Sequence, residues 1–291
     1  MPHRGRARVP AIGDDGGAWV DIGILTLGTI TSTDVAVLAR RAEELGFHSL
    51  WVPEHPVVPV HTRQAVPELY RHFTDPFVAL SRASAVTTRL KLGTAVCLVP
   101  EHHPLVLAKE IASLDMYSGG RFLFGVGAGW LREESEVMGG DFDHRWTQTI
   151  ESIRAMKELW TNEVSEFHGR YYGFPPVYHG PKPVSRPHPP VLLGSRSPRV
   201  FERIVADADG WIPIDPSPAE IESARATLDA LAQAAGRDPA LIQIVADDVD
   251  ADRQRLADLS SAGSDVAVLG PRTPDRQWTV SDLDRAAGAV L

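Results

Sequence analysis

The chain has 291 residues, 43% of them hydrophobic, and a formal net charge of −9 at pH 7. This charge argues against nucleic acids and anionic membranes as partners, and no apolar run is long enough for a transmembrane helix. The single cysteine, Cys97, excludes an internal disulfide and favours a reducing compartment. We therefore expect a cytoplasmic protein that acts on a small molecule.

Residues 1–18 carry three arginines but no apolar stretch after them, unlike a secretory signal. We expect a disordered tail there and a single domain over residues 19–291. Eight short apolar runs predict strands at Val20–Leu25, Ser49–Pro53, Leu90–Val96, Arg121–Val126, Pro190–Gly194, Gly210–Pro213, Ile242–Ala246 and Asp265–Leu269.

Apolar residues at three- and four-residue steps predict helices between these strands, at Asp34–Leu45, Pro104–Met116, Arg145–Trp160, Pro198–Ala206, Pro218–Ala235 and Ala251–Ala262. Alternating strands and helices require a mainly parallel sheet, and eight such units favour a (β/α)8 TIM barrel. The stretch Asn162–Pro189 breaks the rhythm after the fourth strand and its helix. We expect this insertion to shape the mouth of the barrel.

Glu54 and His55 follow the second predicted strand, and the carboxyl ends of strands are where α/β proteins place their chemistry. An imidazole titrates near neutral pH, so His55 is a candidate to donate or accept a proton during turnover. An ordinary surface pair of histidine and glutamate is the alternative.

Two further strand ends are rich in small residues, Gly93–Val96 and Gly125–Gly129. The second has the spacing GxGxG rather than GxGxxG and lacks a strand with an acidic residue about 20 positions on, so a dinucleotide fingerprint is rejected. Small residues let a flat ligand approach the backbone, although a tapering barrel also needs them for packing.

Gly194, Ser195 and Arg196 follow the fifth strand and open a helix, which makes them candidates for a phosphate site; a plain serine cap is the alternative. We expect Cys97 to be a buried structural thiol. No metal is expected, because the remaining histidines lack ligand spacing: His102, His103, His144, His179 and His188.

Taken in order, several motifs resemble the luciferase-like monooxygenase superfamily, in particular its coenzyme F420-dependent oxidoreductases. They are Gly46–His55, Leu92–Pro100, Leu114–Arg121, Gly125–Trp130, Pro189–Ser195 and Ala208–Trp211. The resemblance implies a (β/α)8 barrel with an insertion, a deazaflavin at the carboxyl face, and a homodimer.

By this resemblance Glu54 lies at the place of a cofactor-pocket carboxylate, and His55 at that of an active-site histidine. Ala95 and Val96 lie where the family has a non-proline cis peptide behind the deazaflavin, and Gly194 and Ser195 where it has two glycines against the phosphate. The remaining cofactor-binding residues expected on these motifs are Thr94, Gly125, Gly127 and Arg196.

Trp130 replaces an acidic residue of the sugar-phosphate dehydrogenases in this branch, and Glu133 and Glu134 are not its equivalents by alignment. This departure favours an apolar or aromatic substrate beside Trp130. The expected function is hydride transfer with F420, in which His55 moves the accompanying proton and Glu54 orients His55 or the cofactor. An FMN-dependent monooxygenase using O2 and a non-catalytic flavin-binding barrel are the alternatives.

Overall fold

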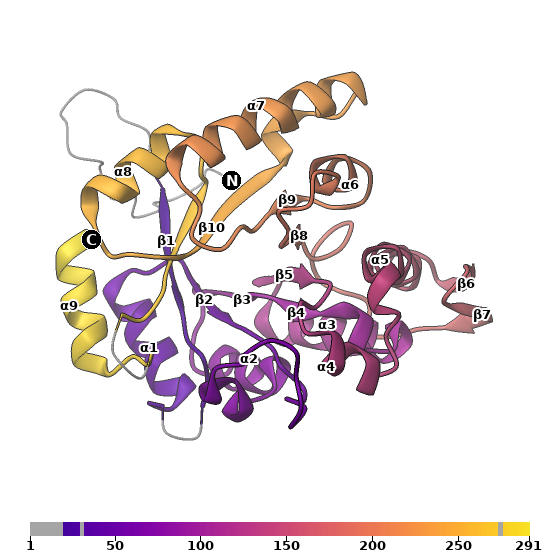
Figure 1. The fold of residues 1–291 in the computed structure, drawn as a ribbon, viewed down its shortest axis with the longest axis horizontal. Coiled ribbons are helices and arrows are strands. Elements are labelled where there is room, and N and C mark those ends of the chain that lie inside the picture. Colours follow the sequence, from indigo (N-terminus) through magenta and orange to yellow (C-terminus); the bar gives the residue numbers. More distant parts are fainter. Residues whose placement is uncertain (1–19, 30–31, 273–275) are drawn as a thin grey trace.

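A computed structural model describes residues 20–29, 32–272 and 276–291, and in it eight parallel strands close into a barrel (Figure 1). Each strand pairs with the next, and the last pairs with the first. The strands are β1 (Asp21–Leu25), β2 (Ser49–Val52), β3 (Lys91–Thr94), β5 (Phe122–Gly127), β8 (Val191–Leu193), β9 (Gly210–Trp211), β10 (Gln243–Val249) and β11 (Val266–Leu269). The predicted (β/α)8 barrel is confirmed, whereas the predicted tail lies outside the described residues.

The third predicted strand is interrupted. After β3 comes a cis peptide bond between Ala95 and Val96, and then the short strand β4 (Cys97–Leu98). Both β3 and β4 pair with β5, so the chain bulges between them without leaving the barrel wall. The non-proline cis linkage expected at this position is therefore confirmed.

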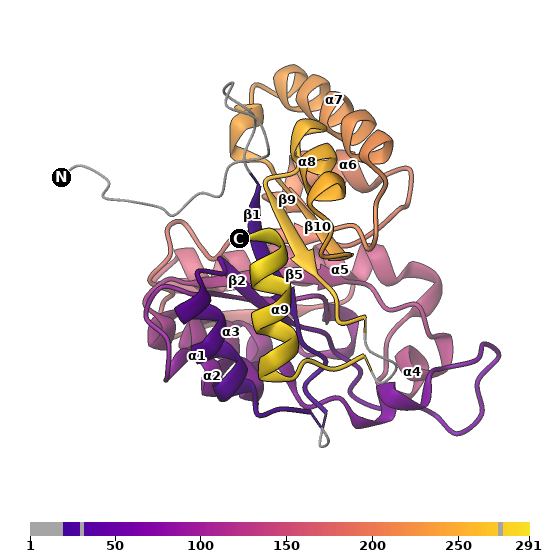
Figure 2. The ribbon, with the colours of Figure 1, turned by 90° about the vertical axis from the view of Figure 1, so that its left-hand side faces the viewer.

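The helices lie outside the barrel. They are α1 (Val35–Leu45), α2 (Pro76–Ser84), α3 (Pro104–Ser118), α4 (Arg132–Val137), α5 (Arg145–Thr161), α6 (Val200–Asp207), α7 (Pro218–Ala234), α8 (Arg253–Ser261) and α9 (Val280–Val290). Asp34 caps α1 through the amide of Ala36, and Gly46 ends it in the left-handed conformation. Helix α9 lies beside α1 and so completes the ring (Figure 2). Within the described ranges, no helix is long and apolar enough to cross a bilayer.

Side chains fill the lumen of the barrel as well as the layer between strands and helices. Leu25, Trp51, Leu123 and Val245 belong to one buried cluster inside the barrel. The ring of Trp51 occupies the space in front of Gly93, where a Cβ atom would come within 2.2 Å of the indole. Gly93 is thus required by the packing of the lumen, as a tapering barrel predicts.

The insertion folds into an antiparallel hairpin, β6 (Val164–His168) and β7 (Gly173–Tyr178), beside α5 at the edge of the molecule (Figure 1). Its turn is held by Glu151 of α5, which accepts hydrogen bonds from the amides of residues 170, 171 and 172. Asp115, near the end of α3, accepts from the amides of Val184 and Ser185.

That the insertion bounds the active-site mouth stays a prediction: its turn contacts loops of the carboxyl face, since the Tyr171 hydroxyl donates to Asp141 at 3.3 Å and the Tyr172 ring lies 6.1 Å from that of His103. The insertion leaves a helix and enters a strand, so in a barrel it starts and ends at the amino face, opposite the usual site of chemistry. Glu151 and Asp115, which hold it by hydrogen bonds, belong to the outer helices.

Candidate active site

His55 lies just beyond β2, at the carboxyl face of the barrel, with a side chain only 6% exposed. Its Nδ1 lies 2.6 Å from Oε2 of Glu134, which is itself 1% exposed. Glu134 belongs to α4, the short helix that follows β5, so the pair joins the ends of two barrel strands. A buried carboxylate beside one ring nitrogen orients the imidazole and favours a proton on that nitrogen.

Aromatic rings surround this imidazole. Tyr70 stacks on it with ring centroids 4.9 Å apart, and Phe73 lies at 5.9 Å. Trp130 meets it edge-on, also at 5.9 Å, with the indole nitrogen 3.4 Å from His55 Nε2. The expected neighbourhood of His55 and Trp130 is therefore present, and the partners indicate the tautomer: Nδ1 donates to Glu134, while Nε2 accepts from Trp130.

Glu54 does not touch this imidazole. It is 5% exposed, and its two carboxylate oxygens accept from the Leu98 amide at 2.6 Å and from His102 Nε2 at 2.9 Å. Successive residues of an extended chain point to opposite sides, so Glu54 faces the barrel wall while His55 faces the mouth. The structure does not support an orienting contact of Glu54 with His55, because Glu134 contacts that ring instead, and the alternative contact of Glu54 with the cofactor stays a prediction.

The wall around Glu54 is a cluster of polar groups. Burial lowers the pKa of His102, but the hydrogen bond and charge of Glu54 outweigh it and raise that pKa overall. Burial and Glu54 raise the pKa of the Cys97 thiol, which is fully buried as predicted. Donor atoms of Glu54, Cys97 and His102 lie within 4.8 Å of one another, yet both oxygens of Glu54 already accept hydrogen bonds. We assign no metal to this hydrogen-bonded cluster.

Two more buried carboxyl groups have unsatisfied oxygens. Within the described part of the chain, neither oxygen of Glu101 has a hydrogen-bond partner, and burial together with the charges of Glu134 and Glu54 raises its pKa to about 9. At the end of β10, Oδ1 of Asp247 has no partner, and burial and the charge of Asp248 raise the pKa of Asp247 to about 8. Both groups are therefore protonated at neutral pH.

The predicted cofactor-binding glycines have a packing role. A Cβ atom at Gly125 would lie 1.9 Å from the Thr94 carbonyl oxygen, and one at Gly127 would lie 2.5 Å from Val96 Cγ2. A Cβ at Gly194 would come within 3.0 Å of Val96 Cγ1. The hydroxyl of Thr94 donates to the Gly125 carbonyl at 2.7 Å. These residues let β5 and β8 pack closely against the bulge.

At the expected phosphate site, the side chains of Ser195 and Arg196 make contacts within the protein. The hydroxyl of Ser195 accepts from the Ser197 amide at 3.0 Å, as in the plain serine turn considered from the sequence. Arg196 donates to the Ile214 carbonyl at 2.9 Å and lies 3.4 Å from Glu220 of α7. Arg196 lines a hollow of about 420 Å³ between α6 and α7. Its guanidinium is thus engaged on the helix side, which weakens its predicted role toward a phosphate.

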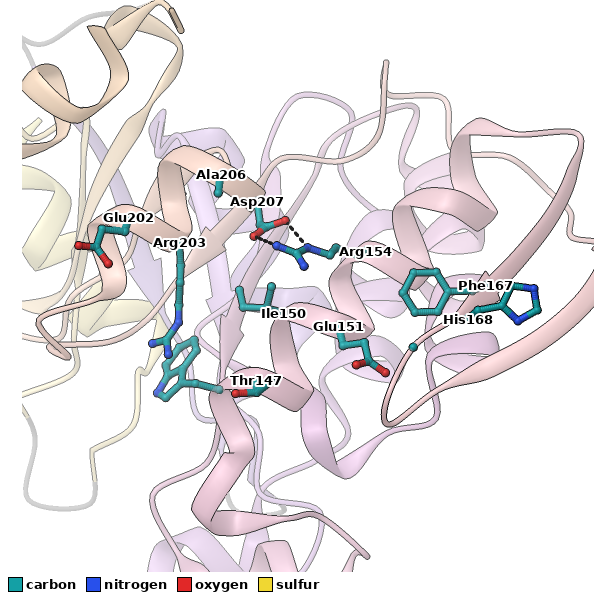
Figure 3. A pocket seen from close by; sticks show the side chains of 12 residues that line it. Thr147, Ile150, Glu151, Arg154, Phe167, His168, Glu202, Arg203, Ala206 and Asp207 are labelled. Atoms are coloured by element: carbon teal, nitrogen blue, oxygen red, sulfur yellow. Dashed lines mark hydrogen bonds and ion pairs between the residues drawn. The ribbon is translucent and has the colours of Figure 1, made fainter. Parts of the chain in front are cut away.

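Another hollow, of about 510 Å³, lies between α5, α6 and the hairpin (Figure 3). Arg154 and Asp207 form an ion pair of 2.7 Å across it, and Phe167 comes from the hairpin side. This hollow lies on the outer helical layer and contains none of the residues around His55. The carboxyl face is the better candidate, because buried ionisable groups meet there at the ends of several strands.

Residues 20–258 match the luciferase-like monooxygenase family model. The chain belongs to this family. An uncharacterized protein of Mycobacterium tuberculosis is 41% identical over 251 residues, which are 83% of this chain and 87% of that protein. The FMNH2-dependent dimethylsulfone monooxygenase of Pseudomonas putida is 36% identical over 128 residues, 42% of this chain and 35% of that enzyme.

Among solved structures of the luciferase-like fold, an F420-dependent secondary alcohol dehydrogenase with a bound F420-acetone adduct matches with a TM-score of 0.66. It covers 94% of this chain and 91% of that one, at 18% identity, a level that shows the fold alone. Luciferase-like proteins thus include enzymes that use F420 and enzymes that use FMN.

The luciferase-like resemblance identified His55 and Trp130, but it missed the role of Glu134. Only the folded chain shows the contact of Glu134 with His55. Tyr70 and Phe73 were also missed: Tyr70 lies in the short 3-10 helix Glu68–His72 and Phe73 directly follows it, and no strand or α-helix pattern marks this segment in the sequence. One feature of the sequence indicated that Asp247 lies at the barrel mouth: it is adjacent to Asp248 at the end of a predicted strand.

Proposed function

We propose that this chain is an F420-dependent oxidoreductase that transfers a hydride between a bound deazaflavin and a small organic substrate. The observation that supports it best is the geometry of His55, whose Nδ1 is held by buried Glu134 while Nε2 meets the rim residue Trp130. An imidazole in this state has a basic nitrogen directed away from its carboxylate partner.

The residues present fit a flat ring. Ala95 and half-buried Val96 supply an apolar surface on the β3, β5 and β8 side of the mouth, made flat by the neighbouring glycines. The loop after β2 covers the other side, because the Thr74 amide donates to the Gly28 carbonyl beyond β1. When bound, a deazaflavin accepts or releases a hydride at one ring carbon, and the protein contributes orientation and electrostatics.

In this proposal His55 takes the hydroxyl proton of an alcohol at Nε2 as the hydride leaves the adjacent carbon, and returns it in the reverse reaction. The contact between Trp130 and Nε2 is long at 3.4 Å, so a substrate hydroxyl can replace it. Glu134 positions the ring and stabilises the imidazolium that forms. Tyr70, Phe73 and Trp130 make the surroundings apolar, which supports an apolar or aromatic substrate.

The test begins with the cofactor. Purified protein is titrated with F420 and with FMN, and the quenching of fluorescence gives a dissociation constant for each. F420 binding followed by its reduction with a panel of secondary and aromatic alcohols supports the proposal. Binding of FMN instead, with O2 consumption, favours the monooxygenase alternative. The similarity to the dimethylsulfone monooxygenase supports this alternative. Binding without hydride exchange favours the non-catalytic barrel.

Variants then test the roles of the residues. His55→Asn should lower turnover by at least about a hundredfold, the usual contribution of a general acid or base, with little change in the cofactor dissociation constant. Glu134→Gln should lower turnover less and shift its pH dependence. His168→Asn is the matched control, since that histidine lies 78% exposed on the hairpin. Equal losses of turnover and cofactor affinity in His55→Asn would contradict the acid–base role.

Two further parts of the proposal rest on the sequence. A homodimer follows from the family resemblance alone, and sedimentation at several protein concentrations tests it. A cytoplasmic location rests on the single cysteine, Cys97, and fractionation of cells tests it.

A further inference from the structure

Asp247 is a buried carboxyl group that no step of the proposed chemistry uses. It is 2% exposed and stands near the end of β10, at the carboxyl face. Its backbone is fixed on both sides, because its amide donates to the Pro213 carbonyl at 2.9 Å and its carbonyl accepts from the Asp215 amide at 2.7 Å. The position of the side chain is therefore set by the sheet.

The strand pairing directs this side chain into the barrel. Ala246 pairs with Ala267 and Val249 with Leu269, so a bulge places Asp247 and Asp248 opposite the single residue Val268. Val268 and Val245, two residues before Asp247, both belong to the cluster inside the lumen. Side chains two positions apart share a face, and bulges near active sites commonly redirect a side chain.

The two neighbouring aspartates have different surroundings. Asp248 binds Arg276 through both carboxylate oxygens, at 2.7 and 2.8 Å, and binds Arg272 at 2.9 Å. Asp247 has no ion pair among the described residues, and its Oδ1 has no hydrogen-bond partner. The arginines nearby are thus committed to Asp248 and leave Asp247 facing apolar lumen residues.

A buried carboxyl group with one unsatisfied oxygen costs roughly 1–3 kcal/mol of stability, and valine or leucine would avoid this cost. Such a group is expected where a ligand completes its hydrogen bonds. We infer that Asp247 is a ligand-binding residue whose carboxyl group hydrogen-bonds to a neutral acceptor, a carbonyl or ring nitrogen, of the molecule that enters the barrel mouth. The inference rests on the proposed function, because it names a further contact of the same site.

The chemistry of the group agrees with this role. Burial and the charge of Asp248 raise the pKa of Asp247 to about 8, against the hydrogen bond from the Asp248 backbone and the charge of Arg276, so the group is protonated at neutral pH. A protonated carboxyl offers one O–H donor, whereas a carboxylate offers none. The acceptor belongs either to the cofactor or to the substrate carbonyl, and β10 lies across the barrel from the Ala95 and Val96 wall.

The test compares Asp247→Leu with Asp247→Asn and measures dissociation constants for F420 and FMN as well as KM for an alcohol or ketone. Asp247→Leu should weaken one of these by roughly tenfold, as for one lost buried hydrogen bond. Asp247→Asn keeps a donor and should restore most of that loss. Asp115→Asn is the matched control, a fully buried carboxyl at the amino face that should leave all three constants unchanged.

The readout identifies the ligand partner. A change in the F420 or FMN constant assigns the contact to the cofactor, and a change in KM alone assigns it to the substrate. Infrared difference spectra of wild type should also show a carboxylic acid band that shifts on binding and is missing in Asp247→Asn. Wild-type constants throughout in Asp247→Leu would overturn the inference while leaving the proposed function intact. Wild-type protein that binds neither cofactor would reject both.

Discussion

Replacing Gly127 with alanine tests how the barrel wall packs against the bulge at Val96. The new Cβ atom would lie 2.5 Å from Val96 Cγ2, whereas carbon atoms pack at about 3.5–4.0 Å. Overpacking of this kind costs about 1–3 kcal/mol. The lower flexibility of alanine in the unfolded chain offsets about 0.4–1 kcal/mol of that cost. We therefore expect a net loss of about 1–2 kcal/mol in the free energy of unfolding.

Urea unfolding followed by tryptophan fluorescence measures this loss, and each kcal/mol should lower the melting temperature by about 2–4 °C. Gly288→Ala is the control, because in the described part of the chain no atom beyond its sequence neighbours and the backbone of α9 lies within 4 Å of the place that the new methyl group would take on this exposed glycine. That change should stabilise the protein by up to about 1 kcal/mol. Gly125→Ala should cost more than Gly127→Ala, since its Cβ would lie 1.9 Å from a backbone oxygen, which cannot rotate away.

The double variant Gly127→Ala with Val96→Ala tests whether the contact with Val96 causes the loss of stability. Removing Cγ2 of Val96 opens the space that the new methyl group needs, so Gly127→Ala in that background should cost less than about 0.5 kcal/mol. A coupling of about 1–2 kcal/mol between the two positions is then expected. An equal cost of Gly127→Ala in both backgrounds would refute the packing argument.

Two further predictions concern buried carboxyl groups. Asp115→Ala removes three hydrogen bonds to Val184 and Ser185, so stability should fall by about 2–4 kcal/mol and hydrogen exchange at both amides should quicken; unchanged exchange would contradict this. Glu101 has a pKa raised to about 9 when folded, so between pH 4.5 and 9 the folded chain holds a proton that the unfolded chain releases. Wild-type stability should therefore decline as pH rises through this range, and the decline should be smaller in Glu101→Gln; parallel urea midpoints from pH 5 to 9 would exclude it.

The architecture followed from local patterns that the fold preserves. Each predicted strand was a short apolar run between turn residues, and such runs become barrel strands because both of their faces are buried. Thus Ser49–Pro53 became β2 (Ser49–Val52), and Asp265–Leu269 became β11 (Val266–Leu269). The break between Ala95 and Val96 was expected only through the family resemblance, since nothing in the local residue pattern announces it.

The sequence alone could not predict which residue contacts His55. Glu134 lies 79 positions away, and its contact depends on the rotation of the short helix α4 about its own axis. The orientation of Glu54 could have been predicted, because neighbouring side chains at the end of an extended strand point to opposite sides. The face at which the insertion begins could also have been predicted, since a segment between a helix and the next strand begins at the amino face of a barrel.

The four buried carboxyl groups near the mouth are compatible with the hydride transfer that we propose there. Glu134 and Glu54 each face a histidine, at 2.6 and 2.9 Å. Glu101 and Asp247 lack such partners, and burial keeps both protonated at neutral pH. A hydride carries negative charge, so unpaired carboxylates beside its path would oppose the transfer in a medium of low dielectric. The arrangement supplies proton donors and acceptors around the mouth while adding little uncompensated negative charge to it.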